Sequence, residues 1–434
     1  PATLAVEAPS TLPDESTIDT FELVLEKDKI SGNAQVKTGT DPGFQIFLAT
    51  SSFSLDHLNQ IPVVGFPEGS AGISANIWQS QSSSEGIQYS GDITVENATL
   101  NVAPMNEPFN ELNAQIKVAD QKADITTASF LFGESRYRVK AEITDLTTPN
   151  IRGKIHGDVL DVNRIIAAFK KPKDKPEKKT SSSGAKGLDF SLELDVKADE
   201  MLFDKFRAGA VSTTWHTTGR VQKFHPVQIS AFGGTLGGIF ELAVMKEGTT
   251  WKTDFKGQSI KLENLWPQLV GEEMETKITG SLSAEGVLSR DPSSKQEGLW
   301  KPLNGQAALT ATDTTFFQSS MFRGLLFAAA GPVGTLFNIV TMQSGTFDAN
   351  TMFFKTVNGT FQLTSGRAHT EDFFFDGSSV DFLFKGDVDF IENYYDMEAR
   401  AIPLSTVGTL MGKVPVVGKP LDRAKQSVLS YTFK

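Results

Sequence analysis

The stretch Val380-Asp381-Phe382-Leu383-Phe384-Lys385-Gly386-Asp387-Val388-Asp389-Phe390 decides the fold class of this chain. Every second residue, starting at Val380 and ending at Phe390, is apolar or glycine, and the residues between them are mostly charged. This period of two predicts a β-strand with one apolar face and one solvated face.

The same alternation recurs along the chain, in Phe21–Leu25, Ile93–Val95, Leu188–Val196 and Ala307–Ala311. Clusters of Gly, Asn, Asp and Ser separate these runs, as tight turns between antiparallel strands require. Threonine and serine fill many of the outward positions, where they suit a pleated surface. The sequence therefore predicts a mainly β protein built from antiparallel strands.

An internal repeat is visible. Leu160–Ile166 resembles Ile260–Trp266 about a hundred residues later, and Phe53–Leu58 is an earlier copy at nearly the same spacing. Upstream, Thr127–Gly133 resembles Ile229–Gly238, and Phe373–Ser379 is a third version. The predicted units are residues 1–65 (a partial β repeat), 66–169 (a β repeat), 170–187 (a Lys-, Pro- and Ser-rich linker or loop), 188–300 (a β repeat) and 301–434 (a C-terminal region with helical segments).

Two segments break the β pattern: Lys170–Lys186 is polar and rich in lysine and proline, and Ser320–Met342 is too densely apolar for a surface strand. We predict short helices at Met321–Met342 and Thr406–Ala424, which either plug the end of a β core or meet a membrane. The predicted architecture is an elongated, repeat-built, twisted, U-shaped antiparallel sheet with an apolar groove and a few short helices near the C-terminus.

Composition excludes several classes of function. The net charge of −11 argues against nucleic acid as a partner, and the absence of cysteine excludes disulfides and thiolate metal sites. The five histidines are scattered singly, and no nucleophile elbow, phosphate loop or metal-binding motif occurs. We therefore expect no enzyme activity, no cofactor and no metal site. The chain starts at Pro1 without a signal peptide, and we expect it to be a piece of a longer array.

The apolar face is the remaining candidate site. The 32 phenylalanines exceed the 5 tyrosines and 5 tryptophans by far, and the strand units lack a second dense set of apolar runs to close a sandwich. An uncovered apolar face normally marks a binding surface, and each CH₂ group moved out of water gains about 0.8 kcal/mol, which favours acyl chains as the ligand. The predicted lipid-binding residues are Phe361, Leu363, Phe373, Phe375, Val380, Phe382, Phe384, Val388 and Phe390.

The C-terminal third resembles the AsmA-like C-terminal domain of AsmA, YhdP and their relatives in diderm bacteria. The matching pieces follow in order: Phe322–Leu326, Phe347–Asn350, Gly359–Gly366, Phe382–Phe390, Ile402–Leu404, Val414–Gly418 and Tyr431–Lys434. The resemblance implies a bridge-like lipid transfer protein of the periplasm. It also implies an inner-membrane anchor through an N-terminal helix absent from this chain, and phospholipid moving between the inner and outer membranes, with other envelope proteins as further partners.

Two other classes stay open, and a hydrolase is disfavoured. A scaffold or assembly factor for outer-membrane biogenesis would use exposed strand edges and conduct no lipid. A solenoid-like surface or adhesin domain would have a filled, dry core. A hydrolase would need a nucleophile and a base, and the sequence offers no such pair.

Overall fold

The computed structural model confirms a mainly β chain, which divides into two compact units. Unit 1 comprises residues 1–204 and 214–219, and unit 2 comprises residues 205–213 and 220–434. The structure describes residues 15–25, 28–38, 42–58, 64–80, 86–102, 105–146, 148–168, 191–218, 221–245, 248–270, 277–290, 303–317, 351–378, 380–389, 391–392, 394–403 and 429–433.

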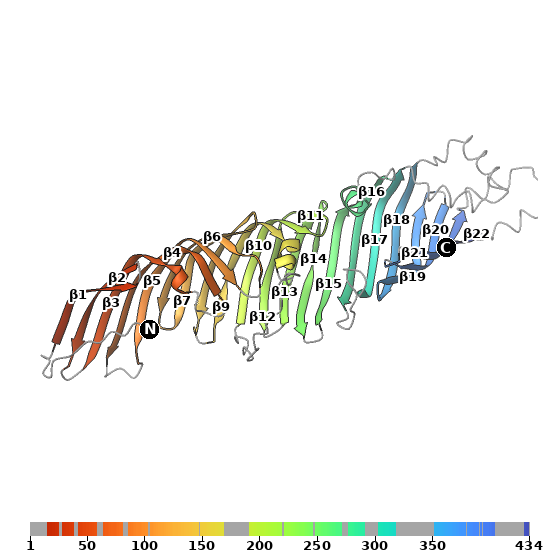
Figure 1. Ribbon diagram of the computed structural model, residues 1–434. Coiled ribbons are helices and arrows are strands. Elements are labelled where there is room, and N and C mark those ends of the chain that lie inside the picture. The colour runs from red at the N-terminus through yellow and green to blue at the C-terminus, as the bar shows by residue number, and fades with distance from the viewer. Residues whose placement is uncertain are drawn as a thin grey trace, which may run out of the picture. The chain divides into compact units, whose positions relative to one another are not determined.

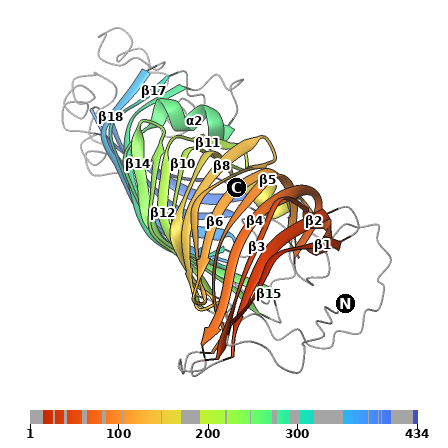
Figure 2. The ribbon, with the colours of Figure 1, turned by 90° about the vertical axis from the view of Figure 1, so that its left-hand side faces the viewer.

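The strands of unit 1 follow one another in chain order through a twisted sheet (Figures 1 and 2). Their bounds are β1 (Glu15–Leu25), β2 (Asp28–Lys37), β3 (Gly43–Ser54), β4 (Val64–Ser80), β5 (Gln88–Val102), β6 (Phe109–Ala119), β7 (Lys122–Phe132), β8 (Ser135–Thr144), β9 (Asn150–Asp161) and β10 (Ser191–Phe203). The residues of β12 (Val211–Thr218) are divided between the two units.

The pairings of β1 to β9 are antiparallel, as the turn pattern predicts, but β9 and β10 pair in parallel. Asn150 lies opposite Ser191 and Asp161 opposite Leu202, so both strands start at the same edge of the sheet. A parallel pair needs a long crossover instead of a hairpin. The chain between Asp161 and Ser191, which contains the predicted 170–187 linker, provides this connection.

Unit 2 repeats the antiparallel arrangement. Its strands are β11 (Phe206–Ala208), β13 (Val221–Ala231), β14 (Gly234–Met245), β15 (Gly248–Lys261), β16 (Lys277–Arg290), β17 (Leu303–Phe317), β18 (Thr351–Thr364), β19 (Arg367–Gly377), β20 (Val380–Asp389), β21 (Tyr394–Pro403) and β22 (Leu429–Phe433). Each strand from β13 to β22 pairs with the next one along the chain, again in antiparallel orientation.

The repeated sequence motif marks a strand that runs directly into a short helix. The first copy ends β3 and forms the 3₁₀ helix η1 (Leu55–Leu58), the second ends β9 and forms α1 (Val162–Ala168), and the third ends β15 and forms α2 (Leu262–Val270). Asp161 caps α1, because its carboxylate accepts the backbone N–H of Arg164 at 2.9 Å. The described helices therefore fall at the repeat motif, while the predicted helices at Met321–Met342 and Thr406–Ala424 lie outside the described residues.

The last two copies share a contact between the helix and an upstream hairpin turn. Gly133 and Gly233 occupy these turns with φ of 65° and 76°. A Cβ atom at Gly133 would meet the guanidinium of Arg164, and one at Gly233 would approach Asn264 at 3.2 Å. Arg164 and Asn264 are the third residues of α1 and α2, so the repeat extends from sequence to tertiary contact. None of the described helices is long and apolar enough to span a bilayer.

Helix α1 covers a small apolar cluster in which Phe132, Tyr137 and Ala168 are buried. The ring of Tyr137 lies over Gly157 of β9, where a Cβ atom would come within 2.5 Å of the ring, and its hydroxyl donates to the carbonyl of Val159 at 2.8 Å. Burial is the largest cause that raises the pKa of Tyr137 from 10.0 to about 12, followed by the negative charge of Asp161.

This phenol makes unit 1 sensitive to alkaline pH. Because the folded-state pKa of Tyr137 is the higher one, its contribution to stability is full below pH 10 and is lost as pH rises toward about 12. Ultraviolet titration of phenolate absorbance should show one of the five tyrosines ionising late. Tyr137→Phe should remove that late step, and a single common titration of all five in the wild type would contradict the packing.

Candidate functional site

An uninterrupted apolar face extends across all ten strands of unit 1. Its longest row of directly opposed residues holds only apolar residues and glycine: Phe21, Gly32, Leu48, Ala75, Gly91, Val118, Ala123, Ile143, Ile151 and Leu192. Nine strand spacings of about 4.8 Å each give this row a length of about 43 Å. The strand register therefore places the apolar residues of neighbouring strands side by side, and together they form a continuous surface.

Two parallel rows widen the same face. The first consists of Ile73, Ile93, Ile116, Ile125, Ala141, Gly153 and Leu194, and the second of Phe53, Ala71, Val95, Ala114, Ala128, Val139, Ile155 and Val196. We call the three rows together the unit 1 apolar face. Alanine and glycine are interspersed among the larger residues of these rows.

Phe53, Val95 and Leu192 of the unit 1 apolar face are buried, and its other larger side chains are partly buried. Ile73, Ile93 and Ile116 pack at the margin of a cluster whose buried members are mostly small, such as Ala71, Ala98 and Ala114. All described strands of unit 1 belong to one sheet, so none of them forms an opposing layer. An apolar face of this kind retains solvent-exposed area that a ligand of matching chemistry would remove from water.

In unit 2 one face of the strands carries a dense aromatic cluster. Phe354 and Phe382 are each 1% exposed, and the ring of Phe354 lies 5.7 Å from Phe316, 5.2 Å from Phe375 and 6.2 Å from Phe382. Several of these pairs meet edge to face, the geometry that aromatic rings prefer. The aromatic cluster consists of Phe316, Phe354, Phe361, Phe373, Phe375, Phe382 and Phe384.

The predicted lipid-binding residues belong mostly to this aromatic cluster. The β19–β20 register places Phe373 opposite Phe384 and Phe375 opposite Phe382, and both pairs share one face. Burial divides the predicted set as follows: Phe375, Phe382 and Phe384 are buried, and Phe361, Leu363, Phe373 and Val388 are partly buried. The side chain of Val380 is not described, and Phe390 lies outside the described residues.

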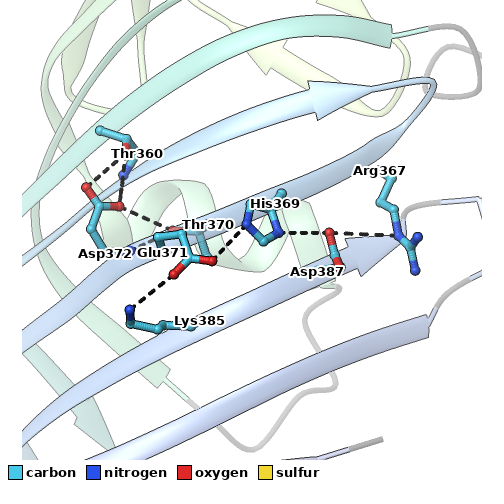
Figure 3. Close-up of polar contacts among 8 residues, drawn as sticks. All are labelled: Thr360, Arg367, His369, Thr370, Glu371, Asp372, Lys385 and Asp387. Carbon is cyan, nitrogen blue, oxygen red and sulfur yellow. Dashed lines mark hydrogen bonds and ion pairs between the residues drawn. The ribbon is translucent and has the colours of Figure 1, made fainter.

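A bulge in β19 brings these phenylalanines onto one face. The β19–β20 register shifts between Thr370 and Phe373, which moves Phe373 and Phe375 to the side that holds Ala368 and Thr370. Asp372 stabilises the bulge, because its carboxylate accepts both the backbone N–H and the hydroxyl of Thr360 at 2.8 Å (Figure 3). The Thr360 N–H is the largest cause that lowers the pKa of Asp372.

The opposite face of β19 and β20 is a ladder of ion pairs (Figure 3). His369 lies 3.1 Å from both Asp387 and Glu371, and Lys385 donates to Glu371 at 3.1 Å. The hydrogen bonds from Lys385 and then His369 lower the pKa of Glu371. Each carboxylate has a cationic or imidazole partner on an exposed surface, which is the ordinary role of the solvated side of a strand. Within the described ranges, no group of three His, Asp or Glu residues is placed to hold a metal ion.

The unit 1 apolar face was not among the predicted site residues. Its signal in sequence is a set of short alternating runs such as Ile93–Val95, and nothing within one strand shows which residues of neighbouring strands stand opposite. Alanine and glycine also lower the hydropathy of each strand. The sequence of a single strand is therefore only weakly apolar, even where the register joins neighbouring strands into a continuous apolar row. All nine predicted lipid-binding residues, most of them phenylalanines, belong to unit 2.

No family model, curated protein or solved structure matches this chain.

Proposed function

We propose that this protein holds phospholipid acyl chains against its apolar sheet faces and carries them between two membranes. The observation that supports this most strongly is the unit 1 apolar face, an apolar row of about 43 Å with partly exposed isoleucines and no opposing layer among the described strands.

The energetics favour lipid as the occupant. Each CH₂ group loses about 0.8 kcal/mol of unfavourable hydration when it moves to an apolar site, so a sixteen-carbon chain gains on the order of 12 kcal/mol. On a surface that is apolar along its whole length, the acyl chain keeps this favourable free energy at every position. It can therefore move along the surface without a large barrier. Carriage of this kind needs positioning and no catalytic group, and we propose a non-enzymatic carrier.

The resemblance to AsmA-like proteins supplies the setting of the proposal. It suggests a periplasmic module of a bridge between the inner and outer membranes, anchored through an N-terminal helix. The aromatic cluster of unit 2 contains most of the predicted lipid-binding residues, and in our proposal its partly buried members Phe361 and Phe373 contact an acyl chain in unit 2.

Site-specific photo-crosslinking tests the proposal. A benzophenone side chain at Ile116 would project from the unit 1 apolar face, and one at Gln115 from the opposite face of the same strand. After incubation with phospholipid vesicles and irradiation, mass spectrometry should find phospholipid adducts at Ile116 and none at Gln115. Adducts in equal yield at both positions would contradict a face-specific site, and adducts to protein in cell extracts without lipid would favour the assembly-factor alternative.

A further inference from the structure

The solvated face of unit 1 carries a cluster of basic side chains that cross-strand pairing compensates only in part. Lys140 of β8 stands directly opposite Lys154 of β9. In the next row, Arg138 stands opposite His156, and His156 stands opposite Lys197 of β10. All of these side chains lie on the face away from the unit 1 apolar face. We call Arg138, Lys140, Lys154, His156 and Lys197 the basic cluster.

In the neighbouring row of the same sheet, carboxylates compensate the positive charges. Lys117 stands between Asp92 and Asp124, and Arg152 stands between Glu142 and Glu193, with its Nε atom 3.7 Å from the Glu193 carboxylate. Each cation there has carboxylates on both sides. Opposite charges across strands stabilise a sheet and like charges directly opposite destabilise it. In this row the like pair Asp124 and Glu142 is flanked by Lys117 and Arg152, whereas Lys140 and Lys154 have one carboxylate between them, Asp195 opposite Lys154.

The three lysines of the basic cluster have no carboxylate within ion-pair distance. In the part of the chain that the structure describes, the side chains of Lys140, Lys154 and Lys197 form no hydrogen bond or ion pair. Arg138 lies 3.9 Å from Asp158, at the limit of an ion pair, and His156 contacts Asp199 at 3.2 Å. Asp195 lies opposite Lys154, but its carboxylate accepts the hydroxyl of Thr214 at 3.0 Å.

These side chains line an open depression of about 760 Å³ over β5 to β10. Its wall contains five Lys and Arg residues (Arg136, Arg138, Lys140, Lys154 and Lys197) and two carboxylates (Glu96 and Asp195). The local charge is therefore positive on a chain whose net charge is −11. A volume in this range matches the pockets that hold small ligands in other proteins.

We propose that the basic cluster binds a phosphate-bearing ligand, either a soluble phosphate compound or the headgroup of an anionic lipid. Opposed residues on antiparallel strands have Cβ atoms about 5 Å apart, so the two flexible lysine side chains of β8 and β9 reach one phosphate group together. Lysine acts on phosphate as a strong point charge, and a doubly charged phosphate relieves the repulsion between the two ammonium groups. Lys197 and Arg138 extend the site to a second phosphate. The site lies on the face opposite to the proposed lipid-carrying surface and does not depend on that function.

Calorimetric titration with pyrophosphate tests binding of a soluble phosphate compound. Flotation with vesicles of phosphatidylglycerol in phosphatidylcholine tests binding of an anionic lipid headgroup. The variant Lys140→Gln/Lys154→Gln removes two charges from the cluster. The matched control Lys117→Gln/Lys122→Gln removes two charges from the same face outside the depression. Both variants retain the Lys-rich residues 170–187, so any diffuse attraction by that stretch is equal in the two.

We expect the Lys140/Lys154 variant to bind at least about tenfold more weakly than the wild type, and the control to change by less than about twofold. Loss of pyrophosphate binding assigns the site to soluble phosphate, and loss of vesicle binding alone assigns it to a lipid headgroup. Wild-type protein that binds neither probe would overturn the proposal, as would an equal loss in the control. Thermal melting of both variants shows whether the sheet is intact. The Lys140→Gln/Lys154→Gln variant should be at least as stable as the wild type, because it removes opposed like charges.

Discussion

Phe354→Ala should open the C-terminal part of unit 2. The Phe354 side chain is 1% exposed and contacts the rings of Phe316, Phe375 and Phe382, so its truncation leaves a cavity in the centre of the aromatic cluster. Removing a buried phenylalanine typically costs about 3–5 kcal/mol. Hydrogen exchange of the β18 to β20 amides should therefore accelerate by roughly two to four orders of magnitude, at about 1.4 kcal/mol per tenfold.

The adjacent residue provides the control. Phe353 is 45% exposed on the other face of β18, so Phe353→Ala removes the same atoms without creating a buried cavity. Its effect should stay within about 1 kcal/mol. Hydrogen exchange resolves the strands individually, so opening of β18 to β20 is distinguished from changes in unit 1. Equal acceleration in both variants would show that the aromatic cluster does not stabilise these strands.

Replacing two facing isoleucines of the unit 1 apolar face should release bound lipid. Ile93 and Ile116 are directly opposed on β5 and β6 and partly exposed. A fully buried isoleucine contributes on the order of 1.5–3 kcal/mol, and an asparagine amide against acyl chains has no hydrogen-bond partner. We expect Ile93→Asn/Ile116→Asn to weaken phospholipid retention more than about tenfold. Native mass spectrometry after incubation with neutral phospholipid vesicles measures the loss.

The same two strands offer a control pair. Thr94 and Gln115 are also directly opposed, but on the solvated face. Thr94→Asn/Gln115→Asn makes two polar substitutions of similar size in the same strands without touching the apolar rows. Lipid retention should be unchanged in this variant, and circular dichroism should show the same β content in both. If both variants keep their lipid, the unit 1 apolar face is not the binding surface.

Strand identity was predictable because a period of two is a local signal. The run Val380–Asp389 forms β20 with Phe382 and Phe384 on one face, as the alternation predicts. Cross-strand register was not predictable, because it depends on bulges such as that between Thr370 and Phe373, which reverse the parity of a strand. Alternation alone places Phe373 on the face opposite to Thr370, and the structure places them together.

The repeat in the sequence was visible without its structural meaning. The motif at Leu160–Ile166 and Ile260–Trp266 reads as an alternating run followed by isoleucine or leucine, and the helix after each strand is too short to show a period of 3.6. The parallel β9–β10 pair left no local signature, since only the length of the connection between Asp161 and Ser191 permits it. The basic cluster was likewise hidden, because Lys140 and Lys154 become neighbours only through the β8–β9 register.

The most direct test of lipid carriage is native mass spectrometry of the purified chain, with solvent extraction and identification of any bound lipid. We expect several phospholipid molecules per chain, since the unit 1 apolar face alone is about 43 Å long. A lipid-free mass, with no phospholipid taken up from vesicles, would contradict lipid carriage and leave the β architecture without a lipid cargo.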